Sequence, residues 1–469
     1  MTESRPHCSC TEFSRAQLLR RGVAEAGAGL PAIEPGMPLP AGTGLSRRHF
    51  LAGSVGLALS VYGASRLGFR AFDEGIAAAA ERLANGRVLV SVFLEGGADG
   101  LSMLAPVNDG TYRKLRPKLA LRPGSGPPFG ADSRLMWHPS LYNLAVLHNE
   151  GKITALPAVG YDHPDQSHFT SRHYWEVGAT DPWLRTGWMG RLVDAVGVPD
   201  NPLQGLSLDG RLAPSLATAK LPVASVDGPD GYDFWTSGVW GEPYDHMLQT
   251  LAGLGARRRG DAALKAAADI TAQSARLYGQ LLPFQSKDGK PSYTSPVRYP
   301  SAKDSSFPSR LAGLAAMIGT GLPLQCVSIT APGGYDTHGD QAGDLTRDLK
   351  LTADTLYSFQ RDLEARGIAD RVVTLVWSEF GRRAEENGSA GTDHGAGGTA
   401  FVIGTQVRGG MLGEFPGLGK GSGLDDDGNL RATTDFRALY RTLLEGWFQV
   451  DPARVLPDAA KFAALPLLK

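Results

Sequence analysis

Short apolar runs alternate with helix-like segments along most of this chain, and this alternation constrains its fold more than any other feature. The first run, residues 88–94, is rich in β-branched side chains and ends at Gly96-Gly97, as a buried strand does before a tight turn. Similar runs occur at 153–159, 326–330, 372–377 and 400–403, and helical patterns occur at 140–149, 168–177, 261–282, 308–318, 344–366 and 434–448. This order predicts an α/β fold with a mostly parallel central sheet.

The composition predicts a folded protein that does not bind nucleic acid. Lys and Arg number 47 against 48 Asp and Glu, which gives a formal charge of -1 in 469 residues, so no general attraction to a polyanion is expected. Hydrophobic residues make up 42%, and the 60 Gly and 31 Pro follow no period, which excludes collagen and wholesale disorder. We expect one domain over residues 87–469, with loop-rich or inserted segments near 122–133 and 285–306.

The N-terminal region predicts export by the twin-arginine pathway. Residues 46–51 read Ser-Arg-Arg-His-Phe-Leu, and the uncharged, weakly apolar residues 51–64 follow. We interpret 1–44 as a disordered n-region and linker, and 45–80 as the signal segment and spacer; an ordinary buried helix is the alternative. The expected partner is the twin-arginine translocase, and the destination is the periplasm, cell envelope or extracellular space. The apolar run is too short to predict a stable transmembrane span.

Acidic residues and histidines follow several of the predicted strands. Glu95 and Asp99 follow the first, residues 162–168 the second, Asp336 and His338 the third, and Glu379 the fourth, with Asp393-His394 in the loop beyond. Ligands of open α/β sheets bind at the carboxyl ends of the strands, so these side chains are expected to converge there. Their mixed oxygen and nitrogen donors predict a metal site.

Each candidate also has a structural interpretation. Ser167, at the start of a predicted helix, suits a nucleophile above the positive end of the helix dipole, and it equally suits an N-cap. Asp336 could bond to its own turn, and Glu379 could form an ion pair with Arg382 or Arg383. His138, His163, His168 and His173 show no His-x-x-x-His spacing, so we interpret most of them as packing residues or supports for ligands.

At these residues the sequence resembles a family, the exported bacterial proteins of domain of unknown function 1501, placed in the alkaline phosphatase and sulfatase superfamily. The matching segments are Phe-Leu-Glu-Gly-Gly-Ala-Asp-Gly-Leu at 93–101, Ser-His-Phe at 167–169, Tyr-Asp-Thr-His at 335–338, Ser-Glu-Phe-Gly-Arg at 378–382, Gly-Thr-Asp-His-Gly at 391–395 and Thr-Thr-Asp-Phe-Arg at 433–437. They follow the order of the family from about residue 45 to the C-terminus.

The resemblance implies a three-layer sandwich of alkaline phosphatase type and cleavage of phosphate or sulfate esters with one or two divalent ions of the zinc, calcium or magnesium class. It implies that Ser167 takes the nucleophile position, that an acid after the first strand, such as Asp99, is a ligand, and that Glu379 belongs to a second metal site. The remaining implied ligands form the first site: Asp336, His338, His394 and, if the loop supplies an Asp-His doublet, Asp393.

The sequence departs from the superfamily pattern at three places. Glu95 ends the first strand where Asp is usual, Asp336 and His338 are two positions apart rather than four, and Glu379-Phe380 replaces an Asp-His pair. One intact metal site is therefore expected rather than two. Arg382 is expected to hold the anionic group of a small ester or glycan substrate. The alternative is a non-catalytic relative that binds a partner or glycan in the cell envelope.

Overall fold

The structure is a computed structural model that describes residues 60–62, 86–198, 201–229, 239, 241–255, 273–275, 277–287 and 290–469. The twin-arginine motif at 46–51 and most of the helix predicted at 261–282 lie outside the described residues. Within the described part of the chain, no helix is both long enough and apolar enough to cross a membrane.

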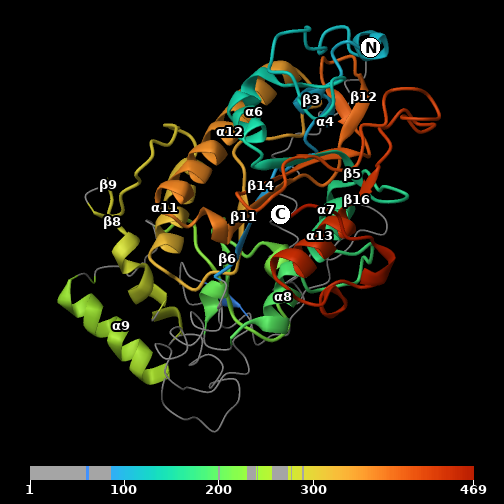
Figure 1. Cartoon of the computed structure of the whole chain (residues 1–469). Coiled ribbons are helices and arrows are strands. Elements are labelled where there is room, and N and C mark those ends of the chain that lie inside the picture. Colours follow the sequence, from blue (N-terminus) through green and yellow to red (C-terminus); the bar gives the residue numbers. More distant parts are fainter. Residues whose placement is uncertain are drawn as a thin grey trace, which may run out of the picture.

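A ten-stranded mixed sheet forms the centre of the molecule (Figure 1). Its strand order is β1-β7-β6-β10-β2-β11-β14-β5-β15, and β16 also pairs with β5. Five neighbouring strands, β7, β6, β10, β2 and β11, run parallel, whereas β14 runs antiparallel to both β11 and β5. The expected α/β class with a mostly parallel sheet is confirmed. The strands are β1 Ser60–Tyr62, β2 Val88–Phe93, β5 Ile153–Gly160, β6 Gly205–Ser207, β7 Val223–Ser225, β10 Cys326–Thr330, β11 Val372–Trp377, β14 Gly398–Ile403, β15 Gly410–Met411 and β16 Thr434–Asp435.

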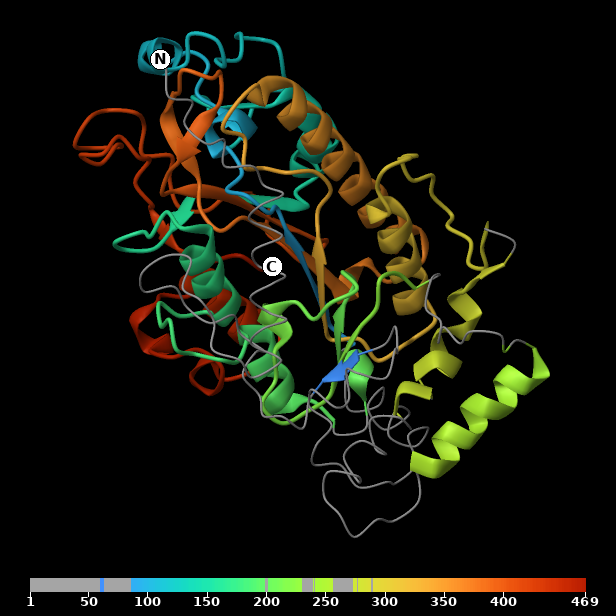
Figure 2. The ribbon, with the colours of Figure 1, turned by 180° about the vertical axis from the view of Figure 1, so that it is seen from behind.

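Helices cover both faces of this sheet, which gives three layers (Figures 1 and 2). Alternate residues of β2 point to opposite faces: Val88, Val90 and Val92 join one hydrophobic core, and Leu89 and Phe93 join the other. The first core is completed by α6 (Tyr142–Asn149), α11 (Phe307–Gly319) and α12 (Gln341–Ala365). The second is completed by α7 (His168–Val177), α8 (Trp188–Val196) and α13 (Phe436–Thr442).

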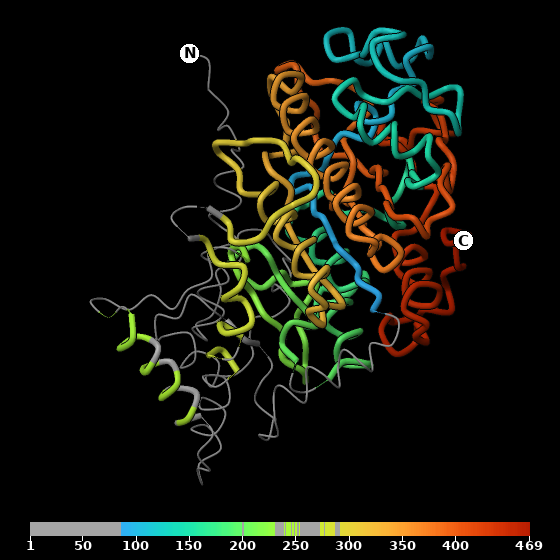
Figure 3. Tube along the Cα trace, turned by 60° about the vertical axis from the view of Figure 1, so that its left-hand side comes forward, coloured from blue at the N-terminus to red at the C-terminus, as the bar shows by residue number. Residues whose placement is uncertain are grey.

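The remaining elements are short or peripheral. Figure 3 shows β2 (blue) running through the interior, while the C-terminal segment (red) lies at the edge of the molecule. Residues 122–133 contain no helix or strand, and the described residues of 285–306 contain only the β8–β9 hairpin. The elements are α4 Gly100–Met103, β3 Leu104–Ala105, α5 Gly110–Leu115, β4 Met136–Trp137, α9 Glu242–Gly255, β8 Ser286–Lys287, β9 Lys290–Pro291, β12 Arg382–Glu386 and β13 Thr392–His394.

Candidate metal centre

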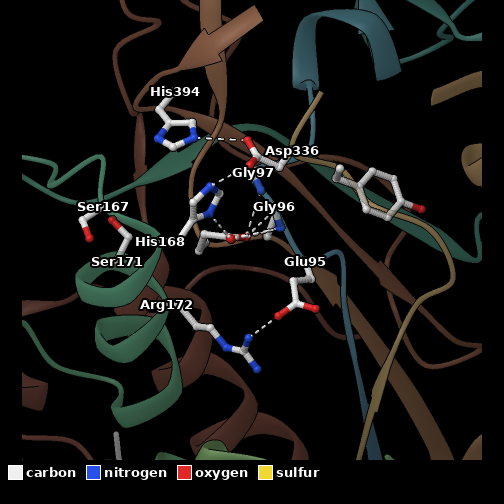
Figure 4. A network of polar contacts seen from close by, with 12 residues as sticks. Glu95, Gly96, Gly97, Ser167, His168, Ser171, Arg172, Asp336 and His394 are labelled. Carbon is white, nitrogen blue, oxygen red and sulfur yellow. Dashed lines mark hydrogen bonds and ion pairs between the residues drawn. The ribbon is translucent and has the colours of Figure 1, made fainter. Parts of the chain in front are cut away.

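The candidate site lies at the carboxyl ends of the central strands (Figure 4). The loop after β10 carries Asp336, and α7, which follows β5, begins at His168. Because β14 is antiparallel to β11 and β5, the residues that precede β14 reach this same edge, and His394 is among them. One reversed strand thus adds a late segment of the chain to a site built from earlier ones.

His394 is positioned by a hairpin that the sequence did not predict. Residues 388–398 showed no strand pattern, yet Thr392–His394 forms β13 and pairs with β12, with His394 opposite Arg382. At the end of the hairpin, Gly395 N–H donates to the Gly381 carbonyl. These backbone contacts fix the position of the His394 imidazole relative to the edge of the sheet.

Three side chains converge there, from His168, Asp336 and His394. Each offers one ligand atom, and these atoms lie within 4.8 Å of one another. His394 Nε2 is 3.2 Å from Asp336 Oδ1, and His168 Nε2 is 3.5 Å from Asp336 Oδ2. The expected proximity of Asp336 and His394 is therefore observed. Two imidazoles and one carboxylate form a donor set that suits a zinc-class ion.

His338 borders the same group. Its Nε2 is 3.0 Å from Asp336 Oδ1 and 2.9 Å from His394 Nε2, and its Nδ1 is 3.2 Å from Asp393 Oδ1. The side chain of Asp393 is more than half exposed, so it lies at the rim. Two imidazole nitrogens at 2.9 Å, both beside a carboxylate oxygen, match the spacing of ligands around one cation, since metal–nitrogen bonds are about 2.0–2.1 Å.

Each imidazole of the group has its other nitrogen engaged by an outer acceptor. His168 Nδ1 lies 2.8 Å from Glu379 Oε1, and His394 Nδ1 lies 2.8 Å from the backbone carbonyl of Gln166. Metal-binding histidines typically donate this second N–H to a carboxylate or carbonyl, which fixes the ring and the tautomer. A proton on Nδ1 leaves the Nε2 lone pair of each ring for a metal ion that Asp336 also binds.

Glu379 is fully buried and is held by the turn that follows β2. Its carboxylate accepts hydrogen bonds from Gly96 N at 3.0 Å, from Gly97 N at 3.0 Å and from Ser378 Oγ at 2.9 Å. Both glycines have positive φ, 120° and 74°, and a Cβ on Gly96 would lie 2.3 Å from the backbone nitrogen of Asp336. The expected tight turn at Gly96-Gly97 therefore positions Glu379, and Glu379 positions His168.

The charges of the group follow from these contacts. Burial disfavours charge on Asp336, but its contacts with His168, His338 and His394, together with Arg382, hold its pKa far below the usual range. Burial also favours neutral His168, but its contacts with Asp336 and Glu379 outweigh this and raise its pKa to about 9. Burial lowers the pKa of His394, so this imidazole is a neutral donor at physiological pH.

Arg382 is buried beneath the group. Its side chain has 0% exposure and pairs with Asp336. Its nitrogens also donate to the backbone carbonyls of Gly97 and Thr392, at 2.7 and 2.8 Å. In this structure the guanidinium fixes Asp336 and joins the β2 turn to the hairpin, and it presents no exposed face to a substrate anion.

Two other predicted site residues have structural contacts of their own. Asp99 is fully buried, pairs with Arg116 at 2.6 Å and accepts hydrogen bonds from Ser102 and Gln341, so its carboxylate belongs to a separate network. Ser167 is the N-cap of α7, and its hydroxyl accepts from Phe169 N at 3.2 Å. Figure 4 shows Ser167 beside the start of α7, while the ring of His168 points toward Asp336.

His168 is the residue of this group that sequence reasoning did not select. It lacks a second histidine at helical spacing, because its partners Asp336 and His394 come from segments far along the chain. The sequence feature that could have identified His168 is its position: it is the first residue of a helix that follows a strand, next to Ser167. Position at a strand end was the better guide to the ligands than spacing within one segment.

Three solved structures are among those with similarity to this chain. The lipoteichoic acid synthase LtaP from Listeria monocytogenes is 9% identical with a TM-score of 0.30 and covers 74% of this chain and 72% of its own. A protein in the alkaline phosphatase superfamily from Vibrio parahaemolyticus is 10% identical, with a TM-score of 0.29. The match covers 95% of this chain and 75% of the Vibrio protein. The PsFucS1 sulfatase from Pseudoalteromonas sp. is 13% identical, with a TM-score of 0.33. The match covers 81% of this chain and 72% of the sulfatase.

No curated protein matches the chain. Residues 255–459 match the family model described as "Protein of unknown function (DUF1501)". This range contains Asp336, His338, Glu379 and His394, whereas the segments at 93–101 and 167–169 precede it. Over residues 255–459, the chain is therefore similar to the DUF1501 family.

Proposed function

We propose that this protein is a metal-dependent hydrolase of phosphate or sulfate esters, with one ion held by His168, Asp336 and His394. The observation that carries the proposal is the convergence of the two Nε2 atoms on Asp336, with each Nδ1 engaged by Glu379 or Gln166. Three protein ligands leave a position open for water or substrate, as in catalytic zinc sites. When bound, such an ion supplies Lewis acidity and lowers the pKa of a coordinated water or hydroxyl.

The residues of the chain support this chemistry in distinct ways. Asp336 contributes the negative charge of the ligand set, and Arg382 fixes its carboxylate from below. Glu379 holds the ring of His168, and the Gln166 carbonyl holds that of His394. His338, whose side chain is 35% exposed, lies on the solvent side and is placed to contact an incoming ester. The imidazole nitrogens favour zinc over calcium or magnesium, which prefer oxygen ligands.

Metal content and turnover test the proposal together. Purified protein should contain about one zinc-class ion per chain by mass spectrometry and should cleave members of a phosphatase and sulfatase substrate panel. His394→Ala should lower metal occupancy and activity in parallel, because it removes a ligand. A protein without bound metal after expression in metal-replete medium, and without activity on the panel, would refute the hydrolase proposal.

The role of Ser167 is tested by a substitution that separates its two interpretations. Ser167→Asn keeps an N-cap acceptor for Phe169 N but removes the hydroxyl. If Ser167 is the nucleophile, this variant should bind metal and lose turnover; if Ser167 only caps α7, turnover should persist, with water as the nucleophile.

A second candidate function is the non-catalytic binding of a partner or glycan in the cell envelope. It is favoured by the burial of Arg382 and by the capping bond of Ser167, because these contacts engage the two groups expected to act on an ester. This candidate predicts a metal-loaded protein that is inert on every ester tested.

We further propose export by the twin-arginine translocase, based on the motif at 46–51. Arg47→Lys together with Arg48→Lys should retain the protein in the cytoplasm, as cell fractionation would show. Unchanged delivery outside the cytoplasm would contradict this route.

A further inference from the structure

A separate pocket of about 190 Å³, lined by apolar and charged side chains, lies beside the candidate metal centre. Its floor is formed by the ends of three strands, at Phe93, Thr330 and Trp377, and its walls by α7 and the short helical turn Pro214–Leu216. It shares α7 and the β2 turn with the metal group but contains none of the three ligands. Figure 4 shows part of this pocket, Arg172 and Glu95, on the far side of the Gly96-Gly97 turn from His394.

Charged side chains in this pocket are mostly removed from solvent. The side chain of Arg172 is 17% exposed and pairs with Glu95 and with Glu176, the latter at 2.8 Å. Asp209 accepts hydrogen bonds from Thr330 N and Oγ1 and lies 3.6 Å from Arg310. Arg211 is exposed and lies at the rim. Semi-buried charges of this kind are expensive to maintain and often mark a binding site.

The pocket offers both donors and acceptors that its own contacts leave available. Among the described residues, Arg172 Nη2 and Glu95 Oε2 have no hydrogen-bond partner, because Arg172 uses Nη1 and Nε for its two ion pairs and Glu95 uses Oε1. A hydroxyl group can donate to the carboxylate and accept from the guanidinium at once. The apolar rings of Phe93 and Trp377 lie below, with centroids 4.5 Å apart, and the Arg172 guanidinium lies over the Phe93 ring.

The pocket presents charges of both signs, which argues for an uncharged ligand. Glu95, Glu176 and Asp209 line it with Arg172 and Arg211, and Arg310 adds a third guanidinium beside Asp209. An anion would meet three carboxylates, and a cation would meet the two guanidinium groups of Arg172 and Arg211. The volume is below the roughly 300–1,000 Å³ of sites for drug-sized ligands, so it suits one ring.

We propose that this pocket binds one neutral, polyhydroxylated ring, such as a single saccharide unit, independently of the metal group. Its hydroxyls contact Glu95 and Arg172, and its apolar edge lies against the floor of the pocket, to which Phe93 and Trp377 contribute. A free sugar and the end of a glycan chain share this chemistry, so the test includes both forms.

Titration of the chelator-treated, full-length protein with neutral monosaccharides and their methyl glycosides, monitored by ligand-detected NMR, tests the site. Saturable binding of either form supports the proposal; binding of the glycosides identifies a chain end, and binding of the free sugars alone identifies a free ligand. Because the metal has been removed, this result is independent of the proposed hydrolase activity. Absence of saturable binding, or tighter binding of sugar phosphates or amino sugars, would overturn the proposal.

Two variants locate the binding. Glu95→Gln should weaken it about tenfold or more, because a charged acceptor is lost. Ala213→Phe should abolish it by filling the pocket without changing any charge. Glu445→Gln and Ala453→Phe, at exposed positions outside the pocket, are the matched controls and should bind as the wild type does. Binding that survives both pocket variants would place the sugar elsewhere and overturn the assignment.

Discussion

Glu379 is charged although fully buried, and it is the residue on which the orientation of His168 depends most directly. Its carboxylate accepts hydrogen bonds from two backbone amides and from Ser378, and these bonds hold it in one orientation. Glu379 was expected to be a ligand of a second ion, but in the structure its carboxylate orients His168. Supporting residues of this kind commonly change metal affinity 10–100-fold when replaced, by rough estimate.

Glu379→Gln should therefore weaken zinc binding by about 10–100-fold while the protein stays folded. The pKa of His168, now about 9, should fall in the metal-free protein because one of the two carboxylates that raise it is gone. Competition with a chromogenic chelator measures the first effect, and an NMR titration of the metal-free protein measures the second. Glu445→Gln, with a half-exposed side chain, is the control. Unchanged affinity would show that Glu379 does not position the ligand.

The burial of His138 predicts how the free energy of unfolding changes at acidic pH. Burial lowers its pKa to about 4, and its Nδ1 accepts a hydrogen bond from Ser140 N at 3.1 Å. As pH falls from about 6.5 to 4, the unfolded chain takes up a proton at this residue before the folded chain does, so the folded state loses about 1.4 kcal/mol per pH unit. This stability is present above the unfolded pKa and is lost on acidification.

His138→Asn keeps an acceptor for Ser140 N but does not titrate, so its free energy of unfolding should fall less steeply between pH 6.5 and 4.5. Urea denaturation at several pH values measures the difference. His163→Asn, at an exposed histidine with φ of 52°, is the control and should follow the wild type. Equal slopes for His138→Asn and wild type would contradict the assignment.

At the scale of elements, the Gly96-Gly97 turn connects the sheet to the metal group. Gly96→Ala should destabilise the fold by about 1–3 kcal/mol and lower metal affinity, because φ of 120° and contact with the Asp336 backbone both exclude a side chain. Chemical denaturation and a metal titration measure these effects. Gly110→Ala, where a Cβ would meet nothing within 4 Å, is the control. A Gly96→Ala protein with wild-type stability would show that the turn tolerates a side chain.

Most of the central elements were predictable from the sequence. The runs at 153–159, 326–330 and 372–377 agree with β5, β10 and β11 within one residue, because buried strands with helices on both faces are continuously apolar. The helix predicted at 168–177 agrees with α7, since Ser167 caps its start and Gly178 ends it in the left-handed region.

Other elements depend on tertiary contacts and leave little trace in the sequence. The strands β6 and β7 have three residues each, too few to show a period, and α8 was not predicted. The strand β12 reads Arg-Arg-Ala-Glu-Glu, and it pairs with β13 because Arg382 and Arg116 anchor it from within. For the same reason the site was predicted in outline, while His168 as part of the group and Arg382 as a buried anchor required the structure.

At the scale of the whole molecule, a bound ion should stabilise the folded state, because the unfolded chain lacks the assembled ligands. At zinc concentrations of about 100 times the dissociation constant, the gain is about 2.7 kcal/mol. Treatment with a chelator should lower the melting temperature by roughly 5 °C, and added zinc should restore it. His394→Ala should show no response to either treatment. A wild-type melting temperature that is indifferent to chelator would contradict a resident ion.

The reversed strand β14 has a consequence for the time course of folding. His168, Asp336 and His394 come from three distant parts of the chain, and they meet only when β5, β10, β11 and β14 have taken their places. Such long-range contacts form late. The metal can therefore bind only after the sheet is complete. Zinc should slow unfolding while leaving the folding rate nearly unchanged. A nascent chain whose last hundred residues have not emerged from the ribosome should be unable to retain zinc.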